Sequence, residues 1–217
     1  MIIKPLFSNK DLLAFYKEGG LPTVPLKTSN NETLLSLISR EYPEVLECGG
    51  PNYWEGGIIH RLDTPTSGIV LATRNQEAYD YLIKLQKEDK IVKKYRALVS
   101  KQDNMLSSFP PFPYAFNSGK MVITSYFRGY GKKGASVRPL LNIDTREYKT
   151  IVEKESEDSF ICTITRGFRH QIRCHLSWSG YPIIGDSQYG GKENEKLMLE
   201  AISISFPYKN STLTINI

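Results

Sequence analysis

The stretch GGIIHRLDTPTSGIVLATR, residues 56–74, sets ionisable side chains between two apolar segments. His60, Arg61 and Asp63 follow one apolar pair, and a polar turn separates them from a second apolar run. Taken alone, Asp63 is a turn residue, because Asp before Thr-Pro is common turn chemistry. His60 alone is a hydrogen-bonded core histidine and Arg61 a surface residue. The apolar flanks are nevertheless typical of core segments, so the charges between them call for an explanation from the rest of the chain.

The whole chain has 217 residues and a formal net charge of +5. This length suits one large domain, and no linker-like segment interrupts it, so we expect a single domain over residues 1–217. The mildly basic balance permits a polyanionic partner without requiring one. The three cysteines are scattered, and the sequence has neither a signal-like N-terminus nor a run of about 18 apolar residues. We therefore expect a soluble cytoplasmic protein with reduced thiols and no membrane contact.

Apolar periodicity predicts strands and helices without regular alternation of the two. Strands are expected at 11–16, 91–99, 160–165, 197–206 and 212–217, and helices at 33–42, 75–87 and about 170–179. Residues 101–122 are rich in proline and are expected to form an irregular insertion, and residues 126–138, YFRGYGKKGASVR, a loop. A mixture of this kind favours an α+β fold over a doubly wound sheet.

A second group of polar residues lies in GFRHQIRCHL, residues 167–176. On a helix, Arg169 and Arg173 are four apart and share a face, and His170 lies three before Arg173. The N-terminus of a helix favours an anion, so a carboxylate or a phosphate would suit this position. The alternative is a basic helix start in solvent, which the apolar neighbours Ile172 and Leu176 argue against.

A third group is KKYRALV, residues 93–99, within the strand expected at 91–99. Tyr95 lies on the apolar side of that strand and, taken alone, is a core tyrosine. Lys93, Lys94 and Arg96 beside it could meet phosphates.

Signatures of several other enzyme classes are missing from the sequence. It contains no GxxxxGK[ST], GxGxxG, HExxH or GxSxG segment, so no nucleotide cofactor is expected. His60, Asp63, His170 and His175 could in principle bind a metal ion. Their spacing matches no well-known site, so no metal is expected.

Together these segments resemble the RluA-type pseudouridine synthases. HRLDTPTSG at 60–68 is similar to the family's HRLDxxTSG signature, KYRALV at 94–99 to its K-x-Y-x-A-L-V strand, and HQIRCHL at 170–176 to its HQIRxHL helix. GYPIIGDSQYG at 180–190 and LMLEA at 197–201 are similar to two later segments. The sequence departs from the family in three places. Lys17-Glu18-Gly19-Gly20 stands where K-P-x-G is frequent, and Glu200 stands where His is common. The residues immediately before the HQIR segment also differ from the family's usual pattern.

The resemblance implies a pseudouridine synthase fold, α+β with a mixed, mainly antiparallel central sheet and flanking helices, without an S4 RNA-binding domain. It implies an isomerase that converts uridine in ribosomal or transfer RNA to pseudouridine. The N1–C1′ bond is broken, the uracil is rotated and a C5–C1′ bond is formed, which needs no cofactor. Asp63 is then the catalytic carboxylate, which attacks the sugar or the base or assists elimination to a glycal.

The resemblance also implies roles for the neighbours of Asp63. Arg173 supplies a cation that offsets the burial of the ionised carboxylate, and Tyr95 stacks on the target uracil. Arg61 takes the place of the base that is flipped out of the RNA. The remaining residues expected to bind substrate are Ile172 as a wall of the base pocket, His60 as a structural hydrogen-bonder, Arg169 and His170.

The basic and aromatic stretch 126–138 is a candidate RNA contact of its own. Rings that stack and charges that meet phosphates together suit single-stranded RNA. The candidate residues are Phe127, Arg128, Tyr130, Lys132, Lys133 and Arg138. Two other functions stay open, a catalytically silent RNA-binding protein on the same fold and a metal-dependent hydrolase. A monomer is the expected state.

Overall fold

The computed structural model of the chain describes residues 3–25, 31–102, 106, 108–142 and 146–217. Contacts group the chain into two compact units, Met1–Ile91 with Ala201–Ile217, and Val92–Glu200. This grouping concerns contacts and does not establish independent domains, so the single-domain organisation stays a prediction.

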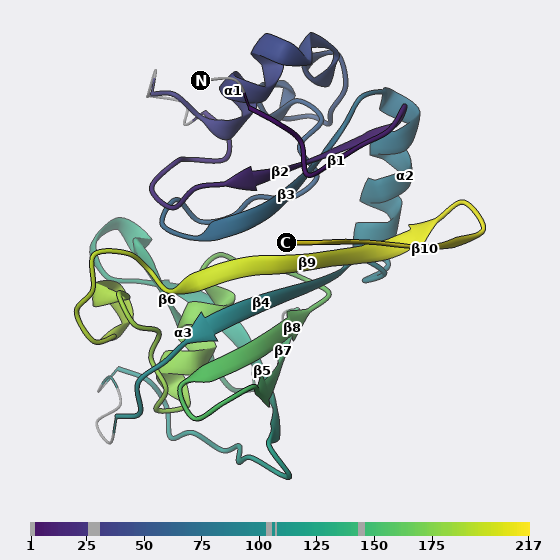
Figure 1. Cartoon of the computed structure of the whole chain (residues 1–217). Helices are drawn as coiled ribbons and strands as arrows, with labels where there is room; N and C mark the ends of the chain where they lie inside the picture. The colour runs from purple at the N-terminus through teal and green to yellow at the C-terminus, as the bar shows by residue number, and fades with distance from the viewer. Residues whose placement is uncertain (1–2, 26–30, 103–105, 107, 143–145) are drawn as a thin grey trace. The chain divides into compact units, whose positions relative to one another are not determined.

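The first unit is built on the strands β1 (Phe7–Ser8), β2 (Leu12–Lys17), β3 (Ser67–Thr73), β9 (Leu199–Tyr208) and β10 (Ser211–Asn216) (Figure 1). Their order is β1-β2-β3-β9, with β10 paired to β9. The ladders β1–β2, β2–β3 and β9–β10 are antiparallel. β2 and β3 are buried almost throughout, so both of their faces are covered. The strand predictions at 11–16, 197–206 and 212–217 are confirmed.

Two capped helices complete the core of this unit. α1 (Leu34–Glu41) begins at a capping box, in which Thr33 accepts a bond from the Ser36 amide and Ser36 accepts one from the Thr33 amide. α2 (Gln76–Lys87) is capped by the side chain of Asn75, as its sequence predicts. The apolar stripe of α2 packs in one cluster with residues of β2, β3, β9 and β10. Short 3₁₀ helices follow α1 at Pro43–Leu46 (η1) and Tyr53–Glu55 (η2).

Gly68 in β3 allows an unusually close approach to β9. Its φ is +117°, and a Cβ built on it would lie 2.4 Å from both the amide nitrogen and the carbonyl oxygen of Ala201. Any side chain at residue 68 would therefore push the two strands apart.

The second unit holds the strands β4 (Val92–Leu98), β5 (Lys120–Tyr130), β6 (Ser136–Leu140), β7 (Tyr148–Lys154) and β8 (Ser159–Ile164). Their order is β4-β8-β7-β5-β6, with antiparallel ladders throughout. α3 (Gln171–Trp178) contacts β6 and β7 (Figure 1). All eight residues of α3 are buried, so this helix has no face in solvent.

Along β4 the exposure alternates as predicted. Lys93, Tyr95 and Ala97 are buried, whereas Lys94 and Arg96 are exposed. This period of two is the sign of a strand with one covered face.

The expectation of a loop at residues 126–138 is wrong. These residues form a β-hairpin from the end of β5, a 3₁₀ turn at Lys132–Gly134 (η3) and β6, with Arg128 opposite Arg138 and Tyr130 opposite Ser136. Gly131 and Gly134 take positive φ values of 76° and 67°, so glycine permits the turn that closes the hairpin. β5 also begins at Lys120, inside the stretch 101–122 expected to be irregular; residues 103–105 and 107 of that stretch lie outside the described residues.

Cys48, Cys162 and Cys174 are all free thiols and all buried. Among the helices of the described residues, none combines the length and the apolar character needed to cross a membrane.

Candidate active site

The turn that carries Asp63 is fixed by backbone bonds within the first unit. The Thr66 amide donates to the Asp63 carbonyl at 3.0 Å, and the Gly20 amide donates to the Thr64 carbonyl at 2.8 Å. Asp63 itself is partly buried. The turn chemistry expected of this segment is therefore present, and it holds a carboxylate that solvent only partly reaches.

Lys17 lies fully buried beside this turn. Its Nζ donates to three carbonyl oxygens, those of Glu18 at 2.9 Å, Leu21 at 2.7 Å and Thr64 at 3.0 Å. Burial lowers the pKa of Lys17 to about 8, and the negative charges of Asp63 and Glu18 oppose that shift. Lys17 is thus a cation electrostatically coupled to Asp63 from within the same unit.

The sequence analysis assigned no role to Lys17. The signal was present, because Lys17 opens the segment that stands where the related family often has K-P-x-G. The segment was described only as a departure from the family, because it lacks the proline of K-P-x-G.

His60 and Arg61 differ in exposure. His60 is buried, and its Nε2 accepts a hydrogen bond of 3.3 Å from the Leu71 amide in β3. Arg61 points its side chain outward, 63% exposed, and its Nη1 contacts the Glu55 carboxylate at 2.9 Å. The two neighbours therefore present one imidazole to the core and one guanidinium to solvent.

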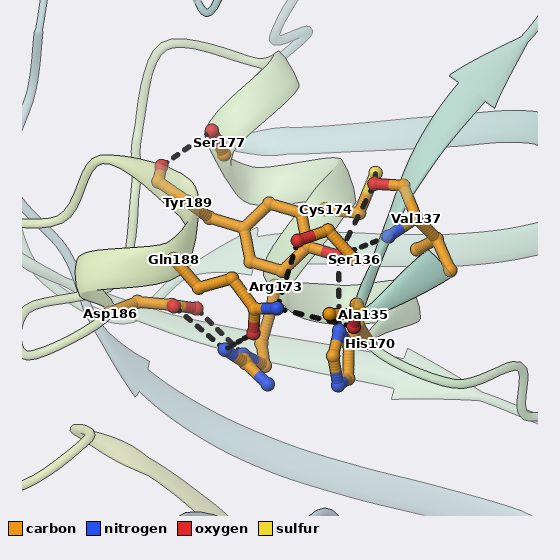
Figure 2. Close-up of polar contacts among 10 residues, drawn as sticks. All are labelled: Ala135, Ser136, Val137, His170, Arg173, Cys174, Ser177, Asp186, Gln188 and Tyr189. Carbon is orange, nitrogen blue, oxygen red and sulfur yellow. Dashed lines mark hydrogen bonds and ion pairs between the residues drawn. The ribbon is translucent and has the colours of Figure 1, made fainter. Parts of the chain in front are cut away.

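In the second unit Arg173 is held by a buried ion pair. Its Nε donates to Asp186 Oδ2 at 2.7 Å and its Nη2 to Asp186 Oδ1 at 2.8 Å, with side-chain exposures of 5% and 1% (Figure 2). Nη2 also donates to Gln188 Oε1 at 2.8 Å, and the guanidinium carbon lies 5.2 Å from the centre of the Tyr189 ring. Two parallel bonds to one carboxylate fix the plane of a guanidinium. The sequence analysis did not name Asp186 or Gln188 as partners of Arg173.

The prediction that Arg169 and Arg173 share a helix face is wrong, because α3 starts at Gln171. His170 precedes it in a left-handed conformation with φ of 58°, which turns the chain before the helix begins. Arg169 instead donates from Nη2 to the carbonyl oxygens of Gly134 and Ser136, at the turn of the β5–β6 hairpin.

His170 contacts Tyr189, with 3.1 Å between its Nδ1 and the tyrosine hydroxyl. Burial lowers the pKa of His170 to about 4, and the charges of Arg173 and Arg169 contribute. At neutral pH His170 is therefore an uncharged ring.

Tyr95 and Ile172 are both buried, at 6% and 5% exposure. Tyr95 stands opposite Cys162 in the β4–β8 ladder, and Ile172 lies in the first turn of α3. The apolar face of β4 thus supplies the ring of Tyr95, and the buried helix α3 supplies the aliphatic side chain of Ile172.

We call residues 126–138 the basic hairpin. Arg128, Tyr130, Lys132 and Lys133 are exposed on it, and Arg138 lies with its guanidinium carbon 5.9 Å from the centre of the Tyr130 ring. Phe127 instead packs against the protein, with its ring stacked on that of Phe168 and the two ring centres 5.0 Å apart.

Among the described residues, no ion pair balances the charges of the basic hairpin. No acidic residue occurs from Lys120 to Asn142. Arg128 faces Arg138 directly across the two strands. Like charges in that position repel each other, which an anionic ligand would relieve.

His175 has its ring nitrogens occupied. Nε2 lies 2.8 Å from Ser125 Oγ, and Nδ1 lies 2.8 Å from Thr150 Oγ1. Burial lowers the pKa of His175 to about 3. Within the residues described by the structure, no three His, Cys, Asp or Glu side chains group as metal ligands do. His175, one of the four residues considered as metal ligands, thus has hydroxyl groups as partners of both its ring nitrogens.

The structure thus groups the candidate residues in two sets. His60, Arg61 and Asp63 stand together in the first unit with Lys17. The second unit holds Arg169, His170, Ile172 and Arg173 around the start of α3, with Tyr95 on β4. A pairing of Asp63 with Arg173 involves both units and stays a prediction.

Comparison with known proteins gives a consistent group of relatives. A family model described as RNA pseudouridylate synthase matches residues 11–178. The chain is 28% identical over 193 residues to a ribosomal large subunit pseudouridine synthase D of Buchnera aphidicola subsp. Schizaphis graminum, covering 87% of this chain and 55% of the relative. It is 25% identical over 188 residues to the protein of the same name from Yersinia pestis, covering 86% of this chain and 52% of the relative.

A solved structure shares the fold. The protein called human RNA pseudouridylate synthase domain containing 1 superimposes with a TM-score of 0.73 at 18% identity, covering 99% of this chain and 82% of that chain. This likeness confirms the α+β, mainly antiparallel fold expected from the sequence. The chain spans about half the length of the curated relatives it matches.

Proposed function

Because the chain belongs to the RNA pseudouridylate synthase family, we propose that it isomerises specific uridines in structured RNA to pseudouridine. The observation that carries the proposal is the family match over residues 11–178, a range that includes Asp63, Tyr95 and Arg173. The reaction exchanges an N1–C1′ bond for a C5–C1′ bond within one nucleotide. C5 loses its proton to solvent, N1 takes up a proton in its place, and no electrons are gained or lost.

Ribosomal RNA is the substrate we propose first, and transfer RNA is the alternative. The names of the Buchnera and Yersinia relatives refer to the large ribosomal subunit, which supports this order. A cytoplasmic location and a monomeric state belong to the same proposal.

Asp63 is the proposed catalytic carboxylate. It attacks the sugar or the base, or assists elimination to a glycal, and each route needs it ionised. Lys17 favours the ionised form, because the two charges attract each other across a partly buried turn. Arg173, aligned by Asp186, is the second cation in the proposal.

Three neighbours receive the target nucleotide in this proposal. Tyr95 stacks on the uracil, and Ile172 closes the base pocket with an apolar wall; their burial suits both roles. Arg61 fills the gap in the RNA when the uridine is flipped out, for which its long exposed side chain is suited.

RNA outside the target nucleotide is proposed to bind the basic hairpin. Its exposed cations suit phosphates, and Tyr130 suits an unpaired base. Phe127 is a weaker candidate for such a contact, since it packs against Phe168, Tyr148 and His175.

The decisive experiment is Asp63→Asn with ribosomal RNA tritiated at uridine C5. We expect tritium release to be abolished while the variant still binds RNA. The matched control is Asp80→Asn on the exposed side of α2, which should release tritium at the wild-type rate. Full turnover by Asp63→Asn would refute the role of Asp63, and binding without turnover by the wild type would favour the silent RNA-binding protein.

A further inference from the structure

Gln188 joins Arg173 to the basic hairpin. Its Oε1 accepts from Arg173 Nη2 at 2.8 Å. Its Nε2 donates to Ser136 Oγ at 2.8 Å and to the Ala135 carbonyl at 3.2 Å (Figure 2). Arginine only donates hydrogen bonds, so it dictates which end of the amide faces it. The other end must then face the hairpin.

On the Arg173 side, Gln188 shares the Nη2 group with Asp186. Asp186 takes Nε and one hydrogen of Nη2, and Gln188 takes the other hydrogen of Nη2. Both partners belong to the short segment around the 3₁₀ helix Ser187–Tyr189 (η4). A shift of Gln188 therefore changes its hydrogen bond to the Arg173 guanidinium, while the two bonds from the guanidinium to Asp186 remain.

On the hairpin side, Gln188 binds where the turn re-enters β6. Ala135 follows η3, and Ser136 pairs with Tyr130 in the ladder. Val137, the next residue of β6, is buried, and its amide donates to the Tyr189 hydroxyl at 2.8 Å. These contacts fix the position of Val137. The bonds of Gln188 are thus closer to the charged tip, beside the bond that Arg169 donates to the Ser136 carbonyl.

We propose that Gln188 is a positioning residue that couples docking of the RNA backbone on the basic hairpin to the orientation of Arg173. The inference rests on the proposed function for the identity of the ligand. Phosphates that bridge Arg128 and Arg138 relieve the repulsion between them and move the turn, and Gln188 passes that movement to the guanidinium. Part of the RNA-binding energy is then used to align Arg173 rather than only to hold the RNA.

The test follows the Nε–H signals of the arginines by NMR while oligocytidylate of about 20 nucleotides is added. Oligocytidylate offers the backbone without a target uridine, so no turnover occurs. The signals of Arg128, Arg138 and Arg173 are assigned from the spectra of the corresponding Arg→Lys variants. Gln188→Met keeps the side-chain length and removes its hydrogen bonds.

The matched control is Gln102→Met. Gln102 donates to the Gly190 carbonyl at 2.8 Å, directly after η4, and makes no bond to Arg173. In the wild type and in Gln102→Met, we expect oligocytidylate to shift the signals of all three arginines. In Gln188→Met, the signals of Arg128 and Arg138 should still shift, while that of Arg173 stays in place.

Two results would overturn the coupling: an equal shift of the Arg173 signal in Gln188→Met, or no shift of it in the wild type. Neither depends on catalysis, so failure of the coupling is distinguishable from failure of the proposed function, which shows as absent tritium release by the wild type. With ribosomal RNA, the single-turnover rate of Gln188→Met should fall about tenfold at little change in affinity. An unchanged rate would count against the coupling as well.

Discussion

Arg173 and Asp186 form a side-on ion pair inside the second unit, with bonds of 2.7 and 2.8 Å and almost no exposure to solvent. Removing water from two charges is costly, and the cost is recovered only while both partners are present. The pair therefore makes Asp186 as necessary as Arg173 for keeping a guanidinium at this position.

Asp186→Asn should destabilise the fold by about 3 kcal/mol, since it removes the negative charge of the buried carboxylate that binds Arg173 through two hydrogen bonds. Urea unfolding followed by circular dichroism measures the change. The matched control is Glu155→Gln, which breaks the equally bidentate but exposed pair of Arg96 with Glu155. Solvent screens that pair, so the midpoint of unfolding should hardly move; equal effects of the two variants would contradict the role of burial.

Acid should destabilise the protein through His175. The folded state holds its ring neutral with a pKa of about 3, whereas the unfolded chain takes up a proton near pH 6.5. The stabilisation is complete above pH 6.5 and is lost as the pH falls from there toward 3, at about 1.4 kcal/mol per pH unit.

His175→Asn should remove one proton from that pH dependence, whatever it does to stability at neutral pH. The free energy of unfolding of both proteins, measured between pH 6 and pH 4, gives the two slopes. His170 contributes in the same direction and is unchanged in the variant. Parallel slopes would mean that His175 titrates alike in the folded and unfolded states.

Lys17→Met should move the acid limb of the pH profile of kcat/KM to higher pH by roughly one unit. The variant removes the cation beside Asp63, so the ionised carboxylate is less favoured. Tritium release at a series of pH values measures the limb. Lys10→Met, at an exposed lysine of the same unit, is the control, and an unmoved limb in Lys17→Met would leave Lys17 with a structural role alone.

Lys132→Ala/Lys133→Ala should weaken RNA binding and flatten its salt dependence. Each phosphate contact with a single strand contributes about 0.7 to the slope of log K against log salt, so the slope should fall by about 1.4. Titrations of oligouridylate at several salt concentrations give the slope. The same change at Lys84 and Lys87, exposed on α2, should leave it unaltered; a loss of equal size there would indicate only a general charge effect.

The sequence predicted what depends on local patterns. The Asn75 cap of α2 and the alternation along β4 follow from neighbouring residues, and both are as expected. The hairpin at 126–138 was missed because glycines and charges are equally typical of loops. Its strands are fixed by pairing with each other and with β7, which is not a local property.

In the candidate site too, local sequence patterns predicted some features, and others depend on contacts formed by the folded chain. Motifs singled out Asp63 and Arg173, but they did not reveal that Lys17 is electrostatically coupled to Asp63 or that Asp186 binds Arg173. The helix start was placed a residue early because His170 adopts a left-handed conformation that its neighbours do not announce. Partners of this kind become visible only when the chain is folded.

The three native thiols are buried, so a single introduced cysteine can be labelled with a dye in their presence. Burial raises the pKa of Cys48, Cys162 and Cys174, and maleimides react with the thiolate. A cysteine introduced in place of the exposed Lys133 would therefore be labelled selectively, with the native cysteines left in place. A fluorophore there would time the arrival of RNA in a stopped-flow instrument, separately from the release of tritium.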